Sequence, residues 1–324
     1  MRFYSPRIFK GFLVILVIGT IVLTMRDAWR WATSNTAAGH LRHADDLWER
    51  GYLDEAIAEY RESLRRNPHN ADAHFKLGEA LANKGDQASA AAEFRESLRL
   101  KPDNLDALNS LGVALLNLGD PDAALADLEQ AIRLKPNNDV AHLNMGNALE
   151  DKGDHDGAIR EYRESLRLNP YSPEAHYNIG NSLYYKKDFK GAVAEYDEAK
   201  RLDVGYVSAY FNTGVVMAET GETDRAIEEF QKTLRLNPDF VKAHYNLGLA
   251  LDRKGDVDGA IAEFRAAIRL KPDYAEAHDS LGTALRSKGD LNSALDEYRK
   301  ALEINPKLSS ARENLDSAQK SKRN

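Results

Sequence analysis

The sequence predicts an all-α fold of stacked helix–turn–helix repeats, because three kinds of residue recur with one period of 34. Prolines, small residues and alanines each keep a register of their own. A period of 20–50 residues is typical of stacked supersecondary units that bury their apolar faces against one another. The registers are Pro68, Pro102, Pro136, Pro170, Pro238, Pro272 and Pro306; Gly78, Gly112, Gly146, Gly180, Gly214, Gly248 and Gly282, preceded by Ala44; and Ala56, Ala90, Ala124, Ala158, Ala192, Ala226, Ala260 and Ala294.

Each unit contains the signals of two helices, as residues 139–172 illustrate. Apolar or small residues at spacings of three and four predict the first helix. Gly153 then predicts a left-handed stop, and Asp154 predicts the cap of the second helix. The second helix should end before Pro170, since proline cannot continue a helix. Small residues at the fixed glycine and alanine positions would let the two helices approach closely.

The registers divide the chain into an amino-terminal segment, eight repeats and a tail. Residues 309–324 keep the first-helix spacing but are otherwise polar, so we expect a capping helix and a basic tail there. The ranges are 1–36 for the amino-terminal segment and 37–70, 71–104, 105–138, 139–172, 173–206, 207–240, 241–274 and 275–308 for the repeats.

The fifth repeat departs twice from the common pattern. Lys187 stands where the other repeats have glycine, and Val204 stands where they have proline. A residue with a Cβ atom in a left-handed stop costs about 1 kcal/mol. We therefore expect the array to divide between Leu202 and Val207 into two cooperative units.

The stretch AHYNLGLAL…GDVDGAIAEFRAAIRLKPD (Ala243–Asp273) resembles a tetratricopeptide repeat (TPR). The resemblance covers eight units from Ala37 to Leu308, and it implies a right-handed superhelical solenoid. First helices would line its concave groove and second helices its convex back. The family's frequent tryptophan at the fourth position of a repeat is absent. In its place stand His40, His74, Leu108, His142, His176, Tyr210, His244 and His278.

The amino terminus has a different composition. Phe12–Met25 is uncharged and apolar, with basic residues on both sides and Trp29 and Trp31 after it. Fourteen residues of helix span only about 21 Å, which would suit a cleaved signal peptide or a buried helix. The tryptophans and the snorkelling reach of Lys10 and Arg26 favour an uncleaved N-terminal hydrophobic anchor helix in a membrane. The basic residues before it favour a cytoplasmic amino terminus, with the repeats on the far side.

The composition argues against several classes of function. The net charge is −7, and residues 1–36 contribute +4, so the remainder carries −11 and is a poor binder of nucleic acid. The chain has no cysteine, and it lacks the common nucleotide-binding, zinc-protease and hydrolase motifs. Histidines of adjacent repeats would lie about 10 Å apart, too far to share a zinc ion. We expect packing histidines, no metal or cofactor, and no enzyme activity.

Asparagines predict a binding groove instead. Asn144, Asn178, Asn212 and Asn246 occupy the sixth position of four successive repeats, which faces the groove in the TPR family. An amide can donate to and accept from a peptide backbone. This series resembles the asparagine-lined superhelix of O-linked GlcNAc transferases, without their catalytic domain. Tyr177, Phe211 and Tyr245 precede three of the asparagines and would add contact area.

The carboxylate clamps of some TPR proteins offer a second comparison. Asn181, Asn212 and Lys242 fit three of the clamp positions, but Tyr177 and Asn246 replace the required cations. A chaperone carboxylate is therefore not the expected ligand. The sequence predicts a membrane-anchored TPR scaffold that binds an extended peptide or protein partner in its concave groove. The alternative is a tethered adaptor that presents substrates to a separate enzyme or secretion machine.

Overall fold

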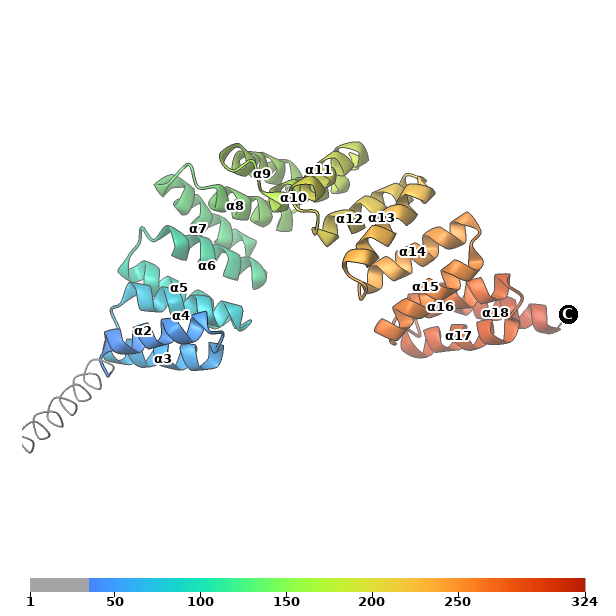
Figure 1. Cartoon of the computed structure of the whole chain (residues 1–324), viewed down its shortest axis with the longest axis horizontal. Helices are drawn as coiled ribbons and strands as arrows, with labels where there is room; N and C mark the ends of the chain where they lie inside the picture. The colour runs from blue at the N-terminus through green and yellow to red at the C-terminus, as the bar shows by residue number, and fades with distance from the viewer. Residues whose placement is uncertain (1–34, 324) are drawn as a thin grey trace, which may run out of the picture. The chain divides into compact units, whose positions relative to one another are not determined.

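The computed structural model describes residues 35–323, which form seventeen α-helices and, within that range, no strand (Figure 1). The predicted anchor, Phe12–Met25, lies outside the described residues. The helices are α2 (Ala37–Glu49), α3 (Leu53–Arg66), α4 (Ala71–Asn83), α5 (Gln87–Leu100), α6 (Leu105–Asn117), α7 (Pro121–Leu134), α8 (Asp139–Asp151), α9 (His155–Leu168), α10 (Pro173–Tyr185), α11 (Phe189–Leu202), α12 (Val207–Glu219), α13 (Thr223–Leu236), α14 (Val241–Lys254), α15 (Val257–Leu270), α16 (Ala275–Ser287), α17 (Leu291–Ile304) and α18 (Ser309–Arg323).

The helices fall into two compact units, one up to Gly153 and one from Asp154. The boundary separates α8 from α9, so it passes through the turn between the two helices of the repeat 139–172. Within each unit, successive helices pack together. First helices of neighbouring repeats also touch: α12 contacts α14, and α14 contacts α16. The all-α prediction is confirmed. The predicted division between Leu202 and Val207 is wrong, because both sides of that junction lie in the second unit.

Local signals act as the sequence predicts. Gly153 has a φ of 77°, the left-handed conformation that ends the first helix. The carboxylate of Asp154 accepts a hydrogen bond from the amide of Gly157 at 2.9 Å and so caps α9. The helix ends at Leu168, before the proline.

A ring-against-glycine contact joins the two helices of most repeats. A Cβ atom on Gly248 would lie 2.6 Å from a ring carbon of Phe264, and one on Gly180 would lie 2.5 Å from a ring carbon of Tyr196. Both rings are almost fully buried. Glycine is therefore needed here for close approach, and the aromatic residue of the second helix fills the space beside it.

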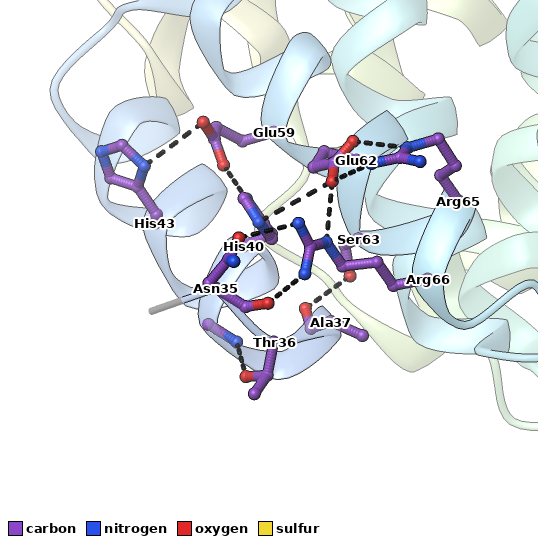
Figure 2. Close-up of polar contacts among 11 residues, drawn as sticks. Asn35, Thr36, Ala37, His40, His43, Glu59, Glu62, Ser63, Arg65 and Arg66 are labelled. Carbon is purple, nitrogen blue, oxygen red and sulfur yellow. Dashed lines mark hydrogen bonds and ion pairs between the residues drawn. The ribbon is translucent and has the colours of Figure 1, made fainter. Parts of the chain in front are cut away.

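The histidines at the fourth position bridge the same two helices. In five of them Nδ1 lies 2.5–2.6 Å from a carboxylate oxygen of the glutamate nineteen residues later. Figure 2 shows the first of these pairs, His40 with Glu59. In four repeats Nε2 also faces a proline carbonyl at 2.9–3.2 Å. The prediction that these histidines pack between helices is confirmed. The pairs are His40–Glu59, His74–Glu93, His176–Glu195, His244–Glu263 and His278–Glu297.

Lysine–aspartate bridges join neighbouring repeats. In each bridge a lysine at the end of a first helix, or just after it, pairs with an aspartate thirty residues earlier, near the start of the preceding second helix. The bridges are exposed, so each contributes little to stability. They are Lys84–Asp54, Lys152–Asp122, Lys186–Asp156, Lys254–Asp224 and Lys288–Asp258.

The junction of the fifth and sixth repeats replaces the histidine pair with another arrangement. Tyr210 takes the histidine position, and Lys200 takes a position where the other repeats have leucine or isoleucine. The ammonium of Lys200 lies 3.3 Å from the carboxylate of Glu229 and 5.1 Å from the centre of the Tyr210 ring. Only 11% of the Lys200 side chain is exposed. The two departures compensate each other, since Lys200 supplies Glu229 with the nitrogen partner that a histidine supplies in other repeats.

The stop at Lys187 yields a test of backbone strain. Its φ is 64°, and its ammonium lies over the rings of Tyr184 and Phe189 at 5.3 and 5.6 Å from their centres. Lys187→Ala keeps the strained conformation and loses the ring contact, whereas Lys187→Gly loses both. We expect the glycine variant to be more stable than the alanine variant by about 1 kcal/mol in chemical denaturation. Equal stability of the two variants would show that the left-handed turn is not strained.

Candidate functional site

The predicted groove residues lie on first helices of both units. Asn144 is on α8 in the first unit, where only 7% of it is exposed. The remaining residues lie in the second unit: Tyr177, Asn178 and Asn181 on α10, Phe211 and Asn212 on α12, and Lys242, Tyr245 and Asn246 on α14. The candidate site is therefore described on the second unit.

Asn181 and Asn212 belong to one hydrogen-bonded cluster. The hydroxyl of Tyr196, on α11, donates to the side-chain oxygen of Asn181 at 2.9 Å. The side-chain nitrogen of Asn212 donates to the same oxygen at 2.9 Å and to the hydroxyl of Tyr177 at 3.1 Å. Asn181 and Asn212 thus join α10, α11 and α12. Within residues 35–323, the nitrogen of Asn181 and the oxygen of Asn212 remain without a partner.

The three fifth-position aromatic side chains share one environment. Each half-buried ring lies between a buried ring of the second helix and a ring at the residue just before the next repeat. The centre-to-centre distances to these two neighbours are 5.0–5.9 Å. Their positions are thus fixed by packing. The three sets are Tyr177 with Tyr196 and Tyr206, Phe211 with Phe230 and Phe240, and Tyr245 with Phe264 and Tyr274.

A small pocket lies between α12 and α14, with a volume of about 150 Å³. We call it the α12–α14 pocket. It combines an apolar surface with an amide, a carboxylate and a guanidinium. The apolar lining is Val215, Ala218, Leu249 and Ala250, and the polar lining is Glu219, Asn246 and Arg253.

Hydrogen bonds orient the polar side chains of this pocket. Arg253 donates to the backbone carbonyl of Ala218 at 3.2 Å, which ties α14 to α12. Asn246 donates to the carbonyl of Lys242 on its own helix at 2.8 Å, which leaves the amide oxygen of Asn246 unpartnered among the described residues. Glu219 accepts from the hydroxyl of Tyr184. The side chain of Lys242 is exposed.

Burial disfavours ionisation of the nearby phenols. Desolvation, followed by the hydrogen bond to Glu219, raises the pKa of Tyr184 to about 12. Burial likewise raises the pKa of Tyr245. Like an ordinary phenol, both hydroxyls are protonated at neutral pH, and burial extends this to higher pH. Among residues 35–323, no three His, Cys, Asp or Glu side chains are placed to hold one metal ion.

Sequence reasoning missed the apolar half of the pocket. Val215 and Leu249 occupy the ninth position of their repeats, where the fifth repeat has Asn181. A comparison of this position along the chain could have found them, because an apolar residue at a position that faces the groove indicates a contact surface. The sequence does not show that the two side chains meet beside Arg253.

The cluster and the pocket predict opposite effects for two similar substitutions. Asn181→Ala removes the acceptor of the buried Tyr196 hydroxyl and of Asn212, so we expect a loss of about 1–3 kcal/mol in the free energy of unfolding. Asn246→Ala removes only a bond within one helix, so its effect should stay within about 0.5 kcal/mol. Chemical denaturation of both variants measures the difference. A stable Asn181→Ala variant would mean that the cluster does not hold the helices.

The sequence matches models of one family along most of its length. A tetratricopeptide repeat model matches residues 41–104, 217–275 and 245–309. Related models match residues 105–138, 146–187 and 173–205. No curated protein sequence gives a significant match.

Several solved structures share the fold. The structure of Cut9–Hcn1, from an APC/C hetero-tetramer, is 19% identical with a TM-score of 0.61, over 88% of this chain and 56% of that chain, so this chain spans about half of it. PilF of Pseudomonas aeruginosa is 21% identical with a TM-score of 0.58, over 64% and 95%. YrrB, described as a TPR protein with an unusual peptide-binding site, is 24% identical with a TM-score of 0.50, over 57% and 95%.

These identities establish the shared fold, and the family models agree with the helix pairs and with the period of 34 residues. The chain belongs to the tetratricopeptide repeat family of protein-interaction scaffolds.

Proposed function

We propose that the first helices of the second unit bind an extended segment of a partner protein, with one apolar side chain of that segment in the α12–α14 pocket. The supporting observation is the pocket itself, in which an apolar surface lies beside an amide, a carboxylate and a guanidinium. Such a combination is typical of a site that buries a side chain while polar groups fix the orientation of the ligand.

The spacing of the helices suits an extended chain. Neighbouring helices pack 8–10 Å apart, and a β-strand advances 3.2–3.4 Å per residue. Every third residue of a bound segment would therefore reach the next first helix. The oxygens of Asn212 and Asn246 could then accept hydrogen bonds from backbone amides of the partner.

The polar groups also restrict how the ligand lies. Arg253 carries a positive charge and Glu219 a negative one, and both border the same small pocket. An uncharged aliphatic side chain can enter the pocket without placing a like charge beside Arg253 or Glu219. The backbone amides on either side of it carry no charge either. Asn212 is already bonded to Tyr177 and Asn181, so its substitution would disturb folding as well as binding.

A displayed library of random dodecapeptides, selected on the full chain, tests the proposal. We expect enriched peptides with one dominant aliphatic position. Leu249→Ala should weaken their binding about tenfold, since it removes much of the apolar surface. Asn246→Ala should weaken binding about 2- to 13-fold, which corresponds to one hydrogen bond of 0.5–1.5 kcal/mol.

Arg269→Ala, at an exposed position of α15, serves as the matched control and should leave binding unchanged. Thermal denaturation identifies any variant that binds poorly because it unfolds. Peptides that bind the folded Leu249→Ala variant as tightly as the original chain would contradict the proposal, and so would a selection that enriches no peptide.

We also propose that Phe12–Met25 anchors the chain to a membrane, with the repeats on the extracytoplasmic side. This proposal rests on the apolar stretch and its aromatic and basic flanks. No helix among residues 35–323 is both long and apolar enough to cross a bilayer. Intact mass measurement of the membrane-extracted protein should find a chain that retains Phe12–Met25. A mature chain that begins after Met25 would contradict the anchor.

A further inference from the structure

A second pocket lies where α11, α12 and α13 meet, and its volume is about 330 Å³. We call it the α11–α13 pocket. It uses other faces and residues of α12 than the α12–α14 pocket does. Its apolar lining is Phe189, Val193, Val216 and Met217, and its polar lining is Lys190, Thr220, Glu222 and Arg225.

The pocket occupies a place where five other junctions have a lysine–aspartate bridge. Lys190 stands at the aspartate position, and Thr220 stands at the lysine position. Thr220 donates to the carbonyl of Val216 at 3.0 Å instead of reaching across to α11. The bridge is thus replaced by an opening with a cation on one side.

Two further departures enlarge or charge this opening. Val193 stands where four other repeats have isoleucine, so the floor loses a methylene group. Glu222 stands where most second helices have a capping aspartate; it forms no cap and instead pairs with Arg225 at 2.6 Å. Around this one pocket, four positions therefore differ from the residue that four to six of the other seven repeats carry there.

The mouth of the pocket is cationic, although the chain as a whole has a net charge of −7. Glu222 neutralises Arg225, but Lys190 forms no ion pair with any residue in the described range 35–323. Lys187 is close by, with its ammonium 5.6 Å from the centre of the Phe189 ring and no carboxylate partner among the same residues. Two lysines next to an apolar floor favour a ligand that is apolar and acidic at once.

We propose that the α11–α13 pocket binds a partner segment in which an aliphatic side chain stands next to aspartate or glutamate. The aliphatic group contacts the partly exposed Phe189 and Val193, beside the buried Val216 and Met217, and the carboxylate pairs with Lys190. One other junction between repeats has no bridge. It carries the uncharged Ala88 and Leu118 at the two bridge positions, so it has no counterpart of Lys190. This site is independent of the groove proposed above.

Methyl resonances of methionine provide a direct test, because the chain has four methionines and Met217 lines the pocket. The full chain, labelled with ¹³C at the methionine methyls, is titrated with the peptide acetyl-Gly-Glu-Leu-Glu-Gly-amide. We expect a saturable shift of the Met217 resonance, assigned through Met217→Leu, and none of Met145. The analogue with glutamine for both glutamates should bind at least tenfold more weakly.

The double variant Lys190→Asp with Thr220→Lys restores the bridge of the other junctions and should abolish the shift. The matched control Lys288→Thr opens a bridge elsewhere and should leave the Met217 titration unchanged, as should Leu249→Ala in the other pocket. The proposal is overturned if Met217 does not respond, if the glutamine analogue binds equally well, if the folded double variant still binds, or if Leu249→Ala abolishes the titration.

Discussion

The contact between a glycine of the first helix and an aromatic ring of the second sets the geometry of most repeats. Because a Cβ atom on the glycine would lie only 2.5–2.7 Å from a ring carbon, the ring packs directly against the backbone of the first helix. The histidine–glutamate pair then spans the same two helices. The aromatic side chains of the candidate site rest on the same buried rings. Groove geometry in the second unit is therefore a consequence of core packing.

Much of the fold could be predicted because its determinants are local. Glycine and proline end helices through their own backbone, and aspartate caps a helix three residues away, so the signals for residues 139–172 are visible in the sequence. The glutamate partners of the histidines were missed, although they keep a constant offset of nineteen residues. Glutamate is common on exposed helix faces, and only the packing of the two helices shows which one faces the imidazole. The division at Gly153 was also missed, since the sequence departs from its pattern at Lys187 and Val204 and not there.

The candidate site was less predictable than the fold. The sequence placed Asn181 and Asn212 on first helices, but it could not show that both hydrogen-bond across the repeat junction and support Tyr196. Partners 31 residues apart in sequence become neighbours only when the repeats stack. The two pockets depend on small differences in side-chain volume and on absent bridges, such as Val193 for isoleucine and Thr220 for lysine. Such differences become informative only when the repeats are compared position by position on the structure.

The constant sequence offsets of the histidine–glutamate and lysine–aspartate pairs affect how the chain could gain or lose a repeat. Most histidine–glutamate pairs and lysine–aspartate bridges join residues at fixed positions of one repeat or of adjacent repeats, so a whole repeat can be gained or lost and every pair is formed again. The fifth and sixth repeats do not have this freedom. Removal of residues 207–240 would bring Glu263 to the place of Glu229 beside Lys200, but it would place Lys190 opposite Lys254. Two ordinary repeats can exchange neighbours and form their bridges again, whereas the fifth repeat would bring a like charge against the lysine of most of the others.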